Sequence, residues 1–114
     1  MPPKRNPLKL NKLQQRTLLL FQELARHPDT SIHDETTGEA TLSTLPHAHG
    51  DHVHIGSFVV SSTDASGFSN ESVWKALERK GLARSNFPLA IILTKEGQNY
   101  DTGLSDRLAQ PSDH

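Results

Sequence analysis

The segment 69–93 constrains the fold of this chain more than any other feature of the sequence. It predicts a helix from Ser69 or Asn70 to Lys80, because those side chains are favoured helix caps and an apolar face follows at helical spacing. Gly81 permits the left-handed backbone that ends a helix and turns the chain toward a strand. The inward residues of the helix are predicted to be Val73, Trp74 and Leu77.

A β-hairpin is predicted to follow this helix directly. Leu82–Arg84 is expected to form a short strand and Leu89–Leu93 a stronger one, because apolar and β-branched residues dominate the second. Residues 85–88, Ser-Asn-Phe-Pro, supply the turn between the two strands. Thr94 is a candidate cap for a final helical turn that Gly97 interrupts.

Another helix is predicted from Asn11 to Arg26. Asn11 can cap it, and His27-Pro28 ends it because the residue before a proline avoids the α-helical region. Its apolar positions recur at the spacing of one buried face, which two further leucines widen. These residues are Leu13, Thr17, Leu20, Phe21 and Leu24, with Leu18 and Leu19 beside them.

The stretch between the two helices is predicted to hold short strands. Ala40–Leu45 and Asp51–Ile55 have apolar residues at alternate positions, and Gly50-Asp51 can turn between them, so we expect a hairpin. Residues 57–66 allow two interpretations. Phe58-Val59-Val60 favours a strand by propensity, whereas Ser57 can cap a short helix.

Three features of residues 63–97 suggest a family. A small residue, Gly67, precedes the helix; the helix ends in Leu77-Glu78-Arg79-Lys80-Gly81-Leu82; and the hairpin closes in Leu93-Thr94-Lys95-Glu96-Gly97. Together they resemble the second half of a winged helix-turn-helix domain from bacterial regulators of the multiple-antibiotic-resistance type. The resemblance implies an α+β, winged-helix-like fold: three helices, a small antiparallel sheet and a C-terminal hairpin.

Three departures from that family pattern stand out. The turn at 85–88 is shorter and less basic than a family wing. Residues 57–66 are weak as a scaffold helix, and the segment 28–56 is an insertion that the family does not predict.

The resemblance implies that the helix 70–80 would lie in the major groove of duplex DNA. The residues placed to contact the nucleic acid are Asn70, Ser72, Lys75, Arg79, Lys80 and Arg84. Lys4, Arg5 and Lys9 could add a phosphate-neutralising arm. Glu71 and Glu78 on the same helix repel phosphate, and winged helices also bind proteins. A protein partner or a homodimer is therefore the competing interpretation.

A histidine cluster is the second candidate site. Four of the seven histidines lie close together with one aspartate among them: His47, His49, Asp51, His52 and His54. Imidazoles at alternate strand positions share one face, so the cluster is a candidate site for Zn2+ or another divalent transition metal. Two alternatives are a solvent-facing hairpin whose histidines alternate with buried Val53 and Ile55, and a surface that responds to pH.

The run His47–His52 is also similar to the His-x-His-x-Asp-His signature of metallo-β-lactamase-fold hydrolases. That family is excluded because its fold needs a much longer chain. The further metal ligands also have no counterpart, since the one histidine after residue 54 is His114.

Composition and charge exclude other functions. The 114 residues contain no cysteine, which excludes disulfides, thiol catalysis and thiolate metal sites. No apolar run approaches the length that spans a bilayer, so no membrane contact is expected, and a cytoplasmic location is the default. The net charge of −1 conceals a segment 1–16 with basic but no acidic residues and a segment 27–51 with the reverse pattern.

The sequence thus predicts a flexible basic arm at 1–10, a single domain at 11–104 and a flexible tail at 105–114. Within that domain, a histidine-rich hairpin insertion is predicted at 28–56. The leading hypothesis is a small, non-enzymatic protein that binds nucleic acid or acts in regulation. The alternatives are a metal-binding or metal-sensing domain and a protein-interaction module.

Overall fold

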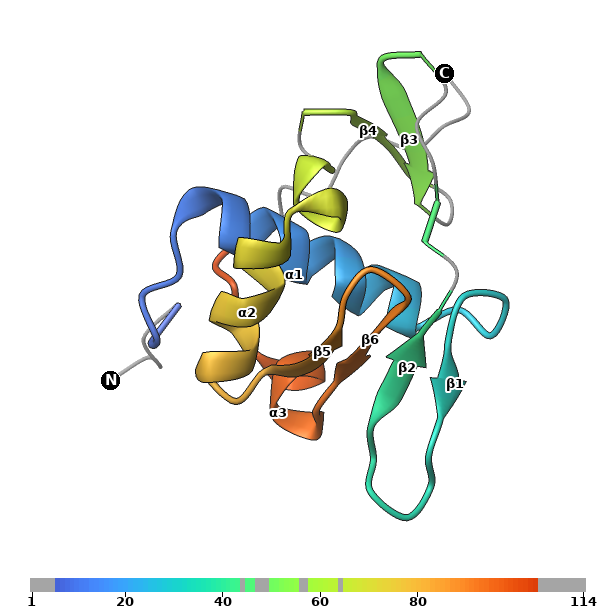
Figure 1. Ribbon diagram of the computed structural model, residues 1–114, viewed down its shortest axis with the longest axis vertical. Helices are drawn as coiled ribbons and strands as arrows, with labels where there is room; N and C mark the ends of the chain where they lie inside the picture. The colour runs from blue at the N-terminus through green and yellow to red at the C-terminus, as the bar shows by residue number, and fades with distance from the viewer. Residues whose placement is uncertain (1–5, 44, 47–49, 56–57, 64, 105–114) are drawn as a thin grey trace.

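The computed structural model describes residues 6–43, 45–46, 50–55, 58–63 and 65–104. Three α-helices and two small antiparallel sheets make up the fold, which confirms the expected α+β class with a hairpin near the C-terminus (Figure 1). In chain order the elements are α1 (Lys12–Ala25), β1 (Ile32–His33), β2 (Ala40–Leu42), β3 (His52–Ile55), β4 (Phe58–Ser61), the 3-10 turn η1 (Ser66–Ser69), α2 (Glu71–Arg79), β5 (Ala83–Asn86), β6 (Ala90–Leu93) and α3 (Lys95–Asn99).

The helix α1 is the centre of the core. Asn11 caps it as predicted: its side chain accepts from the Gln14 N–H, while the Gln14 side chain accepts from the Asn11 N–H. Every residue from Thr17 to Ala25 is buried, because α2, η1, α3 and both sheets pack around this helix. In Figure 1 it passes behind α2 and extends toward β2.

The larger sheet has the strand order β1-β2-β6-β5, and all of its pairs are antiparallel. The pairing of β5 with β6 confirms the predicted C-terminal hairpin, although Ser85 and Asn86 extend β5 instead of forming the turn. In the pairing of β2 with β6, Leu42 lies opposite Ile91 and is fully buried with it. The two strands therefore share one inner face against the core.

The predicted hairpin between 40–45 and 51–55 is wrong. β2 lies between β1 and β6, and β3 pairs with β4 in a separate two-stranded sheet. The physical reason is that β6 offers β2 an apolar partner, whereas β3 and β4 directly follow one another and need only a short connection. The strand interpretation of residues 57–66 is thereby confirmed, and the helical one is wrong. The helical turn before α2 comes later, at η1.

The segment 28–56 is divided between the two sheets. β1 and β2 belong to the larger sheet, and β3 begins the histidine-bearing hairpin, which ends at Ser61. Val53 and Ile55 of β3 are buried and Val60 of β4 joins them, so the inner face of this hairpin is part of the same core.

The entry into α2 depends on a close contact at Gly67. A β-carbon at Gly67 would lie 1.8 Å from Oγ1 of Thr17, and the Gly67 carbonyl accepts a hydrogen bond of 3.1 Å from Nε1 of Trp74. Trp74 is fully buried, with edge-to-face contacts to Phe21 and Phe87. η1 is thus held between α1 and α2, where only a glycine fits.

The two ends of the described chain are bonded to each other. The Asn6 N–H donates to the Asp101 carbonyl, and the Tyr100 hydroxyl donates to Oδ1 of Asn6 and accepts from the Leu8 N–H. Burial raises the pKa of the Tyr100 phenol, while its bond to the Leu8 N–H acts in the opposite direction. Of the predicted flexible arm at 1–10, the described residues therefore lie against the segment that follows α3. The predicted tail at 105–114 lies outside the described residues.

Candidate nucleic-acid interface and histidine hairpin

The outer face of α2 carries the residues predicted to contact nucleic acid. Val73, Trp74 and Leu77 are buried as expected, and Asn70 caps the helix while Gly81, at φ +76°, ends it. The polar residues of the helix consequently point to solvent. The exposed ones are Glu71, Ser72, Lys75, Glu78 and Arg79, with Lys80 at the C-terminal cap.

Two of the four predicted cations are engaged by acidic residues. The Lys75 ammonium lies 3.6 Å from the Glu71 carboxylate, in the pairing one helical turn apart that its sequence spacing allows. Arg84 on β5 donates to the carboxylate of Glu39, which precedes β2. Each of these pairs neutralises a charge that a phosphate group would otherwise meet.

The two uncharged residues predicted for the interface have local roles. Oδ1 of Asn70 accepts from the Ser72 N–H at 3.1 Å and from the Ser72 hydroxyl at 2.6 Å. These bonds satisfy the helix N-terminus, so both side chains serve as a cap. A contact with a base edge would have to compete with the cap.

Arg79 and Lys80 are the remaining predicted cations. Both are exposed at the C-terminal end of α2, and within the described ranges neither has an ion-pair partner. Arg79 lies in the last turn, where a positive charge also complements the helix dipole. The carboxylate of Glu78, which precedes them on α2, accepts a hydrogen bond from the Ser85 N–H of β5, at 3.2 Å from Oε2. The strand β5 is thus bonded to the C-terminal half of α2.

The histidine hairpin brings together two of its predicted metal ligands. His52 and His54 lie on one face of β3, and their rings meet edge to face with centroids 5.0 Å apart. Nδ1 of His52 also lies 3.4 Å from Oδ1 of the exposed Asp51. His47 and His49 fall outside the described residues. Among those that are described, no three histidines or carboxylates converge as a metal site would require.

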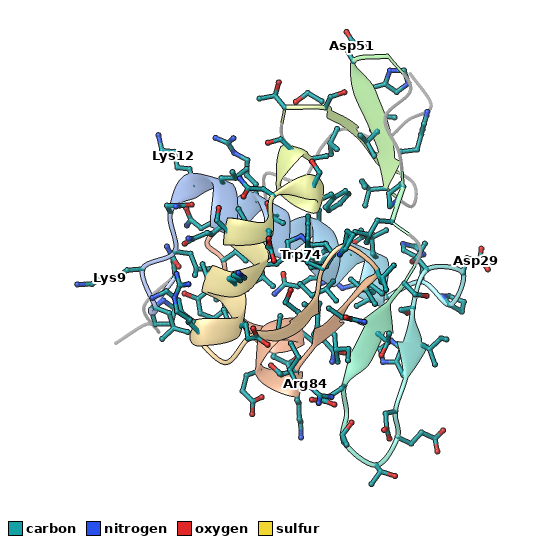
Figure 2. The ribbon with its side chains drawn as sticks, viewed as in Figure 1. Lys9, Lys12, Asp29, Asp51, Trp74 and Arg84 are labelled. Atoms are coloured by element: carbon teal, nitrogen blue, oxygen red, sulfur yellow. The ribbon has the colours of Figure 1, made fainter. Side chains whose placement is uncertain are left out.

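The two candidate sites lie far apart. Figure 2 shows Asp51 at the outer end of the β3–β4 hairpin, where β3 begins, while Arg84 extends from the opposite end of the molecule toward the β1–β2 hairpin. Lys9 and Lys12 lie on a third side, near the start of α1. Lys4 and Arg5 of the predicted arm are outside the described residues.

Sequence reasoning missed Glu39 as the partner of Arg84. The two residues are distant in the chain and meet only because β2 and β5 both flank β6. The acidic block at 27–51 was the available signal, but charge alone does not identify a partner.

Comparison of the chain with family models, with curated proteins and with solved structures finds no match. Within the described ranges, every helix is too short or too polar to cross a lipid bilayer.

Proposed function

We propose that this protein binds duplex nucleic acid, without catalysing a reaction, through the outer face of α2 and the adjoining β5–β6 hairpin. The observation that supports this most directly is the exposed pair Arg79 and Lys80 at the end of a helix whose inner face is completely buried. A helix anchored in this way can enter a major groove without losing its own packing.

The surroundings of α2 also support a winged-helix arrangement. η1 and α2 follow one another at a tight turn, and the hairpin that follows α2 is held in place because β6 pairs with β2 as well as β5. The hairpin is therefore fixed relative to the helix, as a wing beside a recognition helix must be. Its short turn and the Glu39–Arg84 pair limit what it can contribute, so α2 supplies most of the proposed contact.

Binding to duplex DNA across a series of salt concentrations tests this proposal. With two available cations, the logarithm of the association constant is expected to fall with the logarithm of the salt concentration at a slope of about −2. Arg79→Ala and Lys80→Ala should each reduce that slope by about 1. Arg26→Ala is the control because it removes an arginine at the C-terminal cap of α1, which is paired with Glu23 and is outside the proposed interface. Fluorescence anisotropy measures the slope, and no binding at low salt would refute the proposal.

A variant that binds DNA more tightly provides a sharper test than one that binds it more weakly. Glu39→Gln removes the carboxylate that pairs with Arg84, so the guanidinium becomes free to bind a phosphate group. The affinity for duplex DNA should therefore rise about threefold or more. Glu35→Gln is the control, since it removes an exposed carboxylate from the same β1–β2 turn. Equal effects of the two variants would show that only net charge matters, and would exclude Arg84 from the interface.

A second candidate function is metal binding at the histidine hairpin, favoured by the adjacent rings of His52 and His54. Calorimetric titration with Zn2+ and with Ni2+ tests it. Replacing both histidines with alanine should abolish the heat of binding, whereas replacing His27 and His33 with glutamine should preserve it. An unchanged heat in the first variant would exclude these residues as ligands.

A further inference from the structure

The described residues form a cleft of about 620 Å3. Its walls come from the segment that follows β2, from β3 and the segment that follows β4, from η1, and from the turn that joins β5 to β6. In Figure 1 the β5–β6 turn points toward η1, and the β3–β4 hairpin stands beyond both. The cleft thus lies between the β3–β4 hairpin, η1 and the turn of the β5–β6 hairpin.

Among the described residues, the lining of this cleft is mainly apolar and uncharged. Clefts that bind small molecules have volumes of about 300–1,000 Å3 and are lined mainly by apolar and aromatic side chains. The lining here includes the rings of Phe68 and Phe87, together with Leu45, Val53, Ala65 and Leu89. None of the described residues that line it is charged, so transferring an ionised group against this part of the wall would be unfavourable.

Serine hydroxyls provide the polar groups of the cleft. Ser62 donates to the Gly50 carbonyl at 3.3 Å, and Ser69 donates to the Ser66 carbonyl at 3.3 Å. A serine oxygen that donates can still accept, so these two residues present acceptors to the cleft. The complementary ligand carries at least one N–H or O–H donor.

Leu89 marks the open side of the cleft. Its side chain is 72% exposed, which leaves a large apolar group in water at the rim of an uncharged cavity. A ligand that filled the cleft would cover it, whereas Ile32 of β1, which is 70% exposed, does not line the cleft. The chain therefore supplies a matched pair of exposed apolar residues, one inside the site and one outside it.

We propose that this cleft binds an uncharged, largely aromatic small molecule that carries a hydrogen-bond donor. The cleft adjoins the proposed nucleic-acid interface, because the turn of the β5–β6 hairpin lines it, but none of the side chains predicted to contact nucleic acid does. It nevertheless contacts α2 through Phe87, whose ring meets Trp74 edge to face with centroids 4.8 Å apart. Failure of DNA binding would leave this proposal standing.

N-phenyl-1-naphthylamine is a suitable probe, since it is neutral, has two aromatic units and carries one N–H donor. Its sulfonated analogue, 8-anilinonaphthalene-1-sulfonate, is the matched charged probe. We expect the neutral probe to bind saturably at one site, with an affinity at least tenfold higher than that of the analogue. Trp74 is the one tryptophan of the chain, so quenching of its emission by energy transfer reports binding near the cleft. Unsaturable binding, or equal affinity for the two probes, would overturn the proposal.

Two variants locate the bound probe. Leu89→Asp places a charge at the rim of the cleft and should weaken binding of N-phenyl-1-naphthylamine at least tenfold. Ile32→Asp makes the same change at an equally exposed residue outside the cleft and should leave the affinity within twofold of the original. Both side chains are mostly in water, so both variants should fold, which circular dichroism checks. An equal loss of affinity for the probe in both variants, or no loss of affinity in either, would show that the probe binds elsewhere.

Discussion

Two of the β-hairpins of this protein, β3–β4 and β5–β6, have strands of equal length but different numbers of neighbouring strands. β5 and β6 belong to a four-stranded sheet in which β6 has a partner on each side, whereas β3 and β4 have only each other. Both hairpins contribute buried residues to the same core. The difference teaches that the core fixes the inner face of a hairpin, while the number of neighbouring strands decides how firmly its backbone is held.

The largest expected difference between the hairpins concerns their glycines. A β-carbon at Gly97, in α3 where it packs against the start of the β5–β6 hairpin, would lie 1.9 Å from the Leu82 carbonyl oxygen, so Gly97→Ala must displace backbone and should lower the free energy of unfolding by about 3 kcal/mol or more. At Gly50, before β3, an added β-carbon would meet no described atom within 4 Å. Gly50→Ala should therefore cost only about 1 kcal/mol, which reflects its φ of +69°.

Urea denaturation followed by the fluorescence of Trp74 measures both values. Similar losses in the two variants would contradict the view that the β5–β6 hairpin is the more tightly packed of the two.

Amide hydrogen exchange probes the same contrast at the level of the backbone. The amides of Ile91, Ile92 and Leu93 lie between two partner strands, whereas those of His54 and Val59 lie in a single pair. Local opening should therefore be rarer in β6, and its slowest amides should exchange at least tenfold more slowly than those of β3 and β4. Equal protection under native conditions would mean that the two hairpins open as one unit.

The smallest expected difference lies in two hydroxyls at corresponding positions. Thr94 follows β6; its hydroxyl donates to the Gly81 carbonyl at 2.8 Å and accepts from the Gly97 N–H, which caps α3. Ser62 follows β4, and its hydroxyl donates a longer bond of 3.3 Å to the Gly50 carbonyl. Thr94→Val should lower the free energy of unfolding by about 1 kcal/mol, and Ser62→Ala by less than about 0.5 kcal/mol. Thermal unfolding of the two variants measures both losses. A larger loss for Ser62→Ala than for Thr94→Val would contradict the view that the β5–β6 hairpin is held more firmly than the β3–β4 hairpin.

Local features of the fold could be predicted from sequence because neighbouring residues determine them. Asn11 and Asn70 cap their helices, and Gly81 ends α2, as their chemistry requires. The partner of β2 could not be predicted, because the alternation of Ala40, Thr41 and Leu42 fits any strand that completes a buried face. Pairing with β6 is decided by the whole core rather than by the segment itself.

The same distinction applies to the candidate sites: contacts set by spacing along one strand could be predicted, and contacts set by the order of strands in the sheet could not. The period of two along a strand places His52 and His54 on one face, and their rings are indeed adjacent. The neutralisation of Arg84 by Glu39 could not be predicted, because the two residues meet only through the sheet order. The cleft could not be predicted either, since its walls come from several segments that are separate in the chain.

The contact between Thr17 and Gly67 has a consequence for the evolution of this chain. Since the threonine hydroxyl occupies the space where a β-carbon at position 67 would go, the two positions share one small volume. A lineage that acquires alanine at 67 is expected to acquire glycine, or another loss of side-chain bulk, at 17. Covariation between these two distant positions would then be a signature by which related sequences could be recognised.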